Sequence, residues 1–356
     1  MLLDPFTLRC GLTLPNRIAL AALTNGQSQP DGILGDDERK FLVRRAAGGF
    51  GLVCTCAAYV ALDGKGWGGE LGVDRDEDLQ GLTRLASEIK AHGATAFAQL
   101  FHGGARADAQ LSGTPTWSAT AWTDPKISTP RAGTLEDIEH AIASFIAAAV
   151  RVQKAGFDGV ELHGAHGYLL SQFLSRTMNP RDDGWGGDLV GRARLTREVM
   201  RGVRAAVGPT FAVGVRLSME DFGNAKGQDL DDNLQVARWL VEDGADFIHA
   251  SLWDHTKPSV KRPDRHVLTE LRAALPTDIA IVTAGKIWSH AEADAVLALG
   301  ADVVALGRSG ILNPTWPRLE DDLIRRPPMT RAELAEVAVS KVFQDYLTNW
   351  KNFVVD

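Results

Sequence analysis

The chain has 356 residues, of which 45% are hydrophobic, and a formal net charge of −7 at pH 7. Its length and apolar content allow a sizeable core, whereas its negative charge argues against nucleic acid or an anionic membrane surface as the main partner, since both attract clusters of Lys and Arg. The longest apolar helix-like run, residues 141–150, falls far short of the roughly 20 residues that span a bilayer. The three cysteines, Cys10, Cys54 and Cys56, offer no disulfide framework, so we expect a cytoplasmic protein that acts on small molecules.

In chain order, a helical stretch, a glycine or turn, and a short apolar run recur along the sequence. Glycine fits before each run because helices commonly end in a left-handed residue. The runs lack strict alternation, as expected for parallel strands that are covered on both faces. Eight such runs are present, at residues 17–22, 49–54, 93–99, 156–162, 208–216, 244–250, 276–283 and 300–306.

The helical pattern is clearest between residues 138 and 149, where apolar side chains repeat at intervals of three and four. Thr134 and Asp137 are placed to form a capping box at its start. Eight alternating units predict an α/β fold, a single (β/α)8 TIM barrel over residues 1–356 with a tail from about residue 340. The alternative, an open doubly wound sheet, lacks the Gly-x-Gly-x-x-Gly that would follow the first strand of a dinucleotide-binding fold.

Three polar side chains follow the fourth predicted strand, in His163-Gly-Ala-His166-Gly-Tyr168. At a strand end they are expected at the mouth of the barrel, where two imidazoles can donate hydrogen bonds to a carbonyl or nitro oxygen and a phenol can supply a proton. A His-x-x-His pair also fits a metal site. A metal-dependent hydrolase on the same barrel would need further ligands, and His249 and Asp254 are the only suggestive ones.

Polar residues or glycines mark other strand ends too. Loops after strands seven and eight commonly hold a phosphate, and Gly285, Gly307 and Arg308 suit that task because glycine lets backbone N–H groups approach while arginine adds charge. Taken alone, Arg308 could lie on the surface, Arg216 could form a salt bridge at the mouth, and Gln99 could cap a loop. Their placement at successive strand ends favours one site.

Residues 155–187, from Ala155 through His163-Gly-Ala-His166-Gly-Tyr168 to Gly186-Gly187, resemble the signature of the Old Yellow Enzyme family of FMN-dependent ene-reductases. The resemblance implies non-covalent FMN at the C-terminal face of the barrel and NADH or NADPH as electron donor. It also implies ping-pong hydride transfer from flavin N5 to an activated alkene whose oxygen His163 and His166 bind, with Tyr168 as proton donor. Further matching segments, in the family's order, are residues 15–18 with 23–24, 99–100, 215–218, 284–287, and 306–308 with 313–314.

The resemblance further implies where FMN binds. Arg216 is expected near the N1 and C2 carbonyl side of the flavin ring, Gln99 at its pyrimidine edge, and the Thr24 hydroxyl near O4 and N5. Phe101 and Trp67, and also Trp117, are expected to line the substrate pocket because aromatic walls suit planar ligands. The other residues expected to contact FMN are Ala21, Ala22, Leu23, Ala57, Gly285, Lys286, Gly307 and Arg308.

The chain departs from the family pattern at a few positions. Ala22 replaces a common proline, and Cys56-Ala57, expected after strand two, replaces an acidic residue and a small one. None of the changes removes a group that handles flavin or proton. No metal is expected in this interpretation, and a non-catalytic flavin-binding protein is the remaining alternative. The aromatic tail from Tyr346 to Phe353 is expected to dock on the barrel or on a neighbouring subunit of a homo-oligomer.

Overall fold

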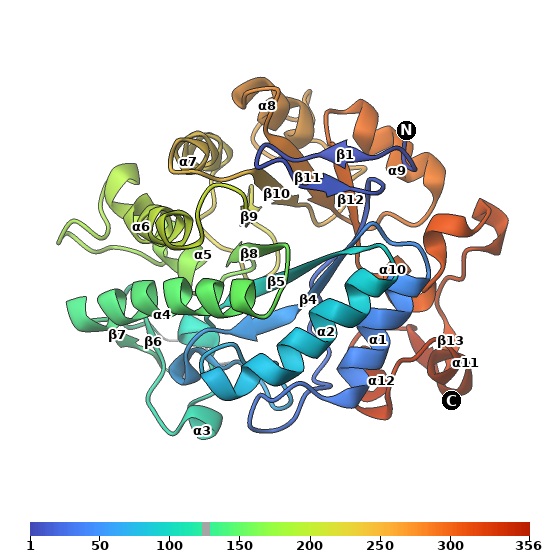
Figure 1. Ribbon diagram of the computed structural model, residues 1–356. Coiled ribbons are helices and arrows are strands. Elements are labelled where there is room, and N and C mark those ends of the chain that lie inside the picture. The colour runs from blue at the N-terminus through green and yellow to red at the C-terminus, as the bar shows by residue number, and fades with distance from the viewer. Residues whose placement is uncertain (123–128) are drawn as a thin grey trace.

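The computed structural model describes residues 1–122 and 129–356. At its centre eight parallel strands close into a barrel, and helices surround it (Figure 1). The strands are buried along their whole length because helices cover their outer face and side chains fill the interior. The barrel strands are β3 (Ile18–Leu20), β4 (Leu52–Tyr59), β5 (Thr95–Phe101), β8 (Gly159–Gly164), β9 (Ala212–Ser218), β10 (Phe247–Ser251), β11 (Ala280–Ala284) and β12 (Val303–Leu306).

The outer helices bury one apolar face against these strands. In α4 (Leu135–Lys154), Ile138, Ala141 and Phe145 are fully buried. The Thr134 hydroxyl accepts the Asp137 N–H at 3.2 Å and the Asp137 carboxylate accepts the Thr134 N–H at 2.7 Å, which confirms the predicted capping box. The other helices are α1 (Asp36–Ala47), α2 (Leu79–Ala91), α3 (Ala109–Ser112), α5 (Leu169–Leu174), α6 (Leu189–Val207), α7 (Leu230–Glu242), α8 (Val267–Ala274), α9 (His290–Ala298), α10 (Arg308–Leu312), α11 (Arg331–Glu336) and α12 (Lys341–Leu347).

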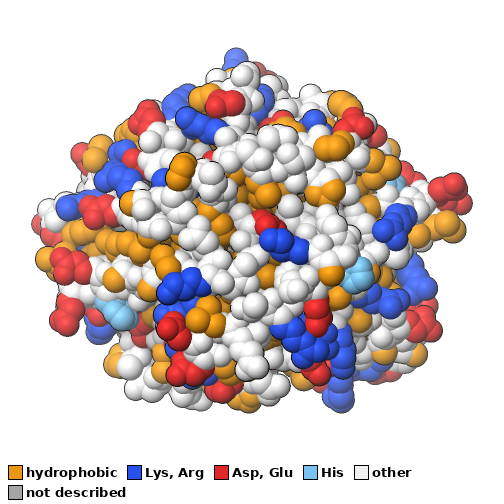
Figure 2. Space-filling model, viewed as in Figure 1, with side chains coloured by type: hydrophobic (Ala, Val, Ile, Leu, Met, Phe, Trp, Pro, Cys, Tyr) orange, Lys and Arg blue, Asp and Glu red, His pale blue; other side chains and the backbone are white. Residues whose placement is uncertain are grey.

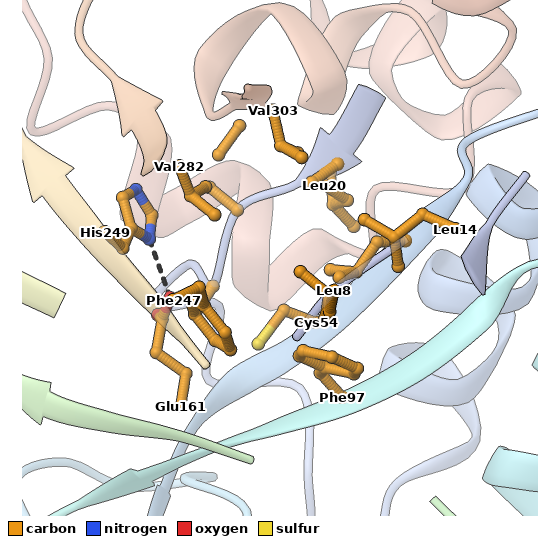
Figure 3. A pocket seen from close by; sticks show the side chains of 15 residues that line it. Leu8, Leu14, Leu20, Cys54, Phe97, Glu161, Phe247, His249, Val282 and Val303 are labelled. Atoms are coloured by element: carbon orange, nitrogen blue, oxygen red, sulfur yellow. Dashed lines mark hydrogen bonds and ion pairs between the residues drawn. The ribbon is translucent and has the colours of Figure 1, made fainter. Parts of the chain in front are cut away.

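A hairpin of β1 (Phe6–Thr7) and β2 (Thr13–Leu14) covers the amino end of the barrel. Leu8 and Leu14 meet side chains from the first residues of the strands, including Phe97 and Phe247, and leave room for about one water molecule (Figure 3). This end is therefore a plug. The remaining short strands are β6 (Trp117–Ser118), β7 (Arg131–Ala132), β13 (Met329–Thr330) and β14 (Val354–Val355), and the 3-10 turns are η1 (Leu62–Gly64), η2 (Asp76–Asp78), η3 (Gly104–Arg106), η4 (Trp316–Arg318) and η5 (Asp321–Leu323).

All eight predicted strands are present, but several ends differ from the prediction. β4 continues to Tyr59, so Cys56 and Ala57 lie within the strand rather than after it. Nothing in the sequence breaks the strand there, and its pairing with β5 resumes at Ala57 after a register shift. β5 and β9 likewise continue beyond Gln99 and Arg216, and β8 includes His163.

None of the helices in the described part of the chain combines the length and hydropathy that a membrane crossing needs. On the face shown in Figure 2, acidic and basic side chains are intermingled. The C-terminal helix α12 lies beside α1, where the rings of Phe343 and Phe41 meet edge to face with centroids 5.4 Å apart (Figure 1). The tail thus packs on its own barrel.

Candidate active site

Two adjoining clefts open at the carboxyl ends of the barrel strands. The first has a cavity volume of about 350 Å³ and the second about 230 Å³, which together suit a cofactor and a small substrate. Because they share walls, the clefts form one continuous site. The shared wall residues are Leu23, His166, Arg216, Phe222, Trp253 and Trp350.

His163 and His166 lie side by side in the wall of the first cleft. The His163 Nε2 and His166 Nδ1 atoms are 3.3 Å apart, and His166 Nε2 lies 2.8 Å from the Ser251 hydroxyl. The His163 Nδ1 accepts the Ala165 N–H at 3.3 Å, so in the neutral ring Nε2 carries the proton. Burial and the nearby Arg216 cation lower the pKa of His163 to about 3 and that of His166 well below its usual value. Both rings are therefore neutral near pH 7 and can serve as N–H donors.

The backbone at His166 is held in a left-handed conformation, with φ of 60°. Such a conformation is unusual for a residue other than glycine and persists only where surrounding contacts fix it. Two side chains supply such contacts here. The Ser218 hydroxyl accepts the His166 N–H at 3.0 Å, and Arg106 Nη1 donates to the His166 carbonyl at 2.8 Å.

Tyr168 presents its phenol to the same cleft. Its ring meets those of Phe101 and His163 edge to face, with centroids 4.5 and 4.9 Å away, and the Arg106 guanidinium carbon lies 4.3 Å from its centroid. Burial raises the pKa of the Tyr168 phenol, although the charge of Arg106 opposes the shift. The phenol therefore keeps its proton at neutral pH and can donate it.

Buried charges lie below this wall. Gln99 Nε2 donates to Glu161 Oε1 at 2.6 Å, and Glu161 Oε2 lies 2.7 Å from His249 Nδ1 (Figure 3). Burial alone would raise the pKa of Glu161, but His249, Arg216 and Gln99 hold it at about 2, so the carboxylate is ionised. An ionised carboxylate accepts only from the Gln99 NH₂ group, which leaves the Gln99 carbonyl oxygen free for the cleft. Arg216 donates to the Ser251 hydroxyl at 3.2 Å.

The second cleft is lined by loops after β11 and β12, including Gly285, Lys286, Gly307 and Arg308. A Cβ at Gly285 would lie 2.8 Å from the Leu252 carbonyl oxygen, so no larger residue fits there. Lys286 Nζ is paired with Asp254 at 2.9 Å. Arg308 is half-buried and burial lowers its pKa, which makes it a poorly solvated cation facing the cleft.

A family model described as NADH:flavin oxidoreductase / NADH oxidase family matches residues 1–323. The chain belongs to this family. It is 33% identical over 326 residues to a probable NADH-dependent flavin oxidoreductase, YqiG, of Bacillus subtilis, covering 88% of this chain and 86% of that relative. It is 36% identical over 312 residues to an NADPH dehydrogenase of Halalkalibacterium halodurans, covering 86% and 90%.

Among solved structures, an Old Yellow Enzyme homologue from Zymomonas mobilis superposes with a TM-score of 0.83 at 26% identity, covering 97% of this chain and 99% of that one. The expected family and the expected barrel are thus confirmed. As a member of this NADH:flavin oxidoreductase family, the protein is an oxidoreductase with FMN as cofactor and a reduced nicotinamide nucleotide as electron donor.

The residues present fit an FMN molecule that extends through both clefts. Small residues at the ends of β3 and β4 leave the floor open, three arginines lie in the walls, and Gly285 provides close backbone approach. All the residues predicted to contact FMN line one or both clefts: Ala21, Ala22, Leu23, Thr24, Ala57, Gln99, Arg216, Gly285, Lys286, Gly307 and Arg308.

The residues suggested for a metal-dependent hydrolase have other partners. His249 is bonded to Glu161, and Asp254 is paired with Lys286. Among residues 1–122 and 129–356, no group of three or more His, Cys, Asp and Glu side chains is placed to hold a metal ion. Together with family membership, these contacts leave the hydrolase interpretation without support.

Two aromatic residues differ from the prediction. Trp67 lines the first cleft, but Phe101 is fully buried and packs behind Trp67 and Tyr168, with centroids 5.2 and 4.5 Å away. Trp117, 1% exposed, packs against His102, and its indole N–H bonds Asp63 at 2.8 Å. Neither residue lines the first or the second cleft.

Several lining residues were not predicted. Arg106 follows β5 in a Gly-Gly-Ala-Arg turn, and its position after a strand end was the available signal. Tyr346 and Trp350 belong to the aromatic tail, for which docking was expected without a stated position. The other unpredicted lining residues are Phe222, Gly223, Asn224, Ser251, Leu252, Trp253, Ala284, Ile287, Trp288, Ala305 and Ser309.

Proposed function

We propose that this oxidoreductase reduces the activated C=C bond of α,β-unsaturated carbonyl or nitro compounds with electrons from NADH or NADPH. The observation that carries the proposal is one wall of the first cleft, where the neutral His163 ring lies 4.9 Å, centroid to centroid, from both the neutral His166 ring and the protonated phenol of Tyr168. Donors and an acid so placed match an acceptor whose oxygen gains negative charge as its carbon is attacked.

Each of these side chains has a distinct task. His163 and His166 donate hydrogen bonds to the activating oxygen and stabilise the charge that develops on it. Tyr168 transfers its phenolic proton to the α-carbon. When bound, FMN supplies the hydride chemistry in a ping-pong sequence, with acceptance from the nicotinamide and donation from N5 to the β-carbon.

The cofactor is proposed to span both clefts. Arg216 lies near the N1 and C2 carbonyl side, Gln99 accepts from the pyrimidine edge, and Thr24 meets the O4 and N5 region. Gly285, Gly307 and Arg308 hold the phosphate through backbone N–H groups and charge. We further propose that residues 1–356 form a single FMN-binding domain, with the tail from about residue 340 contributing Tyr346 and Trp350 to the site.

Absorbance of the purified protein tests the proposal in two steps. Flavin absorbance should bleach on anaerobic addition of NADH or NADPH, and it should return when an enone, maleimide or nitroalkene is added. Saturated product should form in the same amount as nicotinamide consumed. Bleaching without reoxidation by any member of the panel would contradict ene-reduction, and no bleaching by either nucleotide would favour a non-catalytic flavin-binding role.

A further inference from the structure

The first cleft is cationic. Its lining contains two arginines, Arg106 and Arg216, and no Asp or Glu. Arg216 faces the buried anion of Glu161 and is assigned to the flavin ring, where a fixed cation stabilises the anionic reduced form. Arg106, by contrast, has been given no role toward the flavin. A cleft lined by charges of one sign concentrates ligands of the opposite charge.

Arg106 has limited contacts with the protein. Its Nη1 donates to the His166 carbonyl at 2.8 Å, and its guanidinium carbon lies 4.3 Å from the Tyr168 ring centroid. Among the residues that the structure describes, no carboxylate lies within 4.0 Å of it. Glu70, a carboxyl near this wall, accepts the Gly66 N–H at 2.6 Å, and burial raises its pKa well above the usual value. That carboxyl is bonded to the loop at Gly66 and, among the described residues, forms no ion pair with Arg106.

Arg106 reaches the cleft from a different strand end than the histidines do. It ends η3 after β5 and stacks on Tyr168, whereas the histidines that would bind the activating oxygen come from β8 and the loop after it. A guanidinium with Nη1 engaged keeps further donors in a planar fork, which matches a carboxylate. Trp67 and Tyr346 supply apolar walls beside it.

We propose that the physiological acceptor carries a carboxylate in addition to its activating carbonyl or nitro group, and that Arg106 binds this carboxylate. The inference rests on the proposed ene-reduction and names its substrate class. The carboxylate lies on the Tyr168 side of the alkene, so its binding aligns the α-carbon with the proton donor.

A pair of substrates tests it. The probes are a linear methyl enone that ends in a carboxylate, with two methylene groups insulating the carboxylate from the alkene, and its methyl ester, so that both alkenes are equally activated. Wild-type protein should reduce the acid with a kcat/KM at least about tenfold above that of the ester, since a hydrogen bond to a charged group favours binding by about 10-fold or more. Arg106→Gln should abolish this preference by lowering kcat/KM for the acid at least about tenfold more than for the ester, while the loss for the ester reports the missing donor to the His166 carbonyl.

Two further variants separate recognition from general effects. Arg106→Lys keeps the charge without the fork and should retain part of the preference. Lys257→Gln removes a cation that lines a neighbouring groove beside Trp253 and should leave the acid-to-ester ratio unchanged. If Lys257→Gln lowers the ratio as much as Arg106→Gln, the effect belongs to overall charge and the assignment is wrong.

The outcomes are distinguishable. An equal loss for acid and ester in Arg106→Gln would make Arg106 a structural support of His166 and overturn the proposal, as would a wild-type preference for the ester. Binding of the two saturated products to the wild-type holoenzyme, followed by flavin absorbance, tests the same preference without any variant, and equal affinity would overturn it. If NAD(P)H bleaches the protein but neither these enones nor any other alkene of the panel is reduced, the ene-reductase function itself fails.

Discussion

The two ends of the barrel interior are built from the same strands and have opposite character. At the amino end Leu8, Leu14, Phe97 and Phe247 fill the space until about one water molecule fits (Figure 3). At the carboxyl end clefts with cavity volumes of about 350 and 230 Å³ remain, lined by arginines, histidines and hydroxyls. The change occurs within a few residues of each strand.

β10 shows how this happens. Alternate residues of a strand point to the same face, so Phe247, His249 and Ser251 form successive layers of the interior. Phe247 belongs to the plug, His249 contacts Glu161 in the middle, and Ser251 contacts His166 at the mouth. One strand thus serves stability at its start and chemistry at its end, and substitutions at the two ends should have separable effects.

Replacement of Tyr168 by phenylalanine should have the largest effect at the mouth. Bleaching by NAD(P)H needs no proton from this phenol, whereas saturation of an enone needs one at the α-carbon. Tyr168→Phe should therefore bleach normally and be reoxidised by an enone about 10²–10⁴-fold more slowly, the usual worth of a positioned acid. Stopped-flow absorbance measures the two half-reactions separately.

Tyr346→Phe provides the matched control, because Tyr346 lines the same cleft. It should leave enone reoxidation close to the wild-type rate. In Tyr168→Phe the rate of flavin reoxidation by nitroalkenes should fall much less than the rate with enones, since the nitronate product persists without immediate protonation. Equal slowing of both half-reactions, or of neither, would remove Tyr168 from the role of proton donor.

A phenylalanine at each end tests the comparison directly. Phe247 is 2% exposed and its ring packs 5.8 Å from that of Phe97, so Phe247→Ala should lower the free energy of unfolding by about 3–5 kcal/mol. Phe222→Ala at the mouth should lower it by about 1 kcal/mol or less, because that ring is only partly buried. Urea denaturation with FMN in fixed excess measures both.

The kinetic effects of these two changes should be the reverse. Phe222 lies 5.8 Å from the His166 ring, so its loss should alter the half-reactions, whereas Phe247→Ala should leave the rates of the folded protein close to wild type. If Phe247→Ala slowed enone reduction in fully folded protein, the two ends could not be treated as separate regions.

The parts of this organisation that local sequence encodes were predictable. Each barrel strand is a contiguous apolar run after a turn, as in residues 244–250, and parallel strands necessarily bring their carboxyl ends together. The histidines, Arg216 and Arg308 could therefore be assigned to one mouth before their contacts were known. Their roles toward FMN and the alkene came from the family resemblance and are not established by placement alone.

Long-range packing was not predictable in the same way. Tyr346 and Trp350 reach the clefts because Phe343 packs on Phe41, a contact between the two ends of the sequence that no local pattern reveals. Phe101 lies two residues after Gln99 in β5, so both side chains point to the same side of the strand, yet Trp67 and Tyr168 cover the Phe101 ring. Whether a side chain lines a cleft or supports its wall depends on what lies over it.

Arg308→Ala should have a smaller effect than Tyr168→Phe or Phe247→Ala, and the most ligand-specific one. As a half-buried cation in the second cleft, Arg308 is proposed to bind the FMN phosphate. Arg308→Ala should weaken FMN binding by about 1.5–3 kcal/mol, the worth of a hydrogen bond to a charged group. Fluorescence titration of apoprotein with FMN and with riboflavin, which lacks the phosphate, measures the effect.

Riboflavin affinity and the melting temperature of the apoprotein should not change in Arg308→Ala, because the residue acts on the phosphate and lies away from the plug. Arg326→Ala offers a matched control, since the exposed Arg326 guanidinium carbon lies 5.6 Å from the Trp288 ring centroid without lining either cleft. It should bind both flavins as wild type does. Equal losses of affinity for FMN and for riboflavin in Arg308→Ala would mean that this arginine contacts the flavin ring or supports the wall rather than binding the phosphate. Lys286, which lines the same cleft, would then be the candidate phosphate ligand.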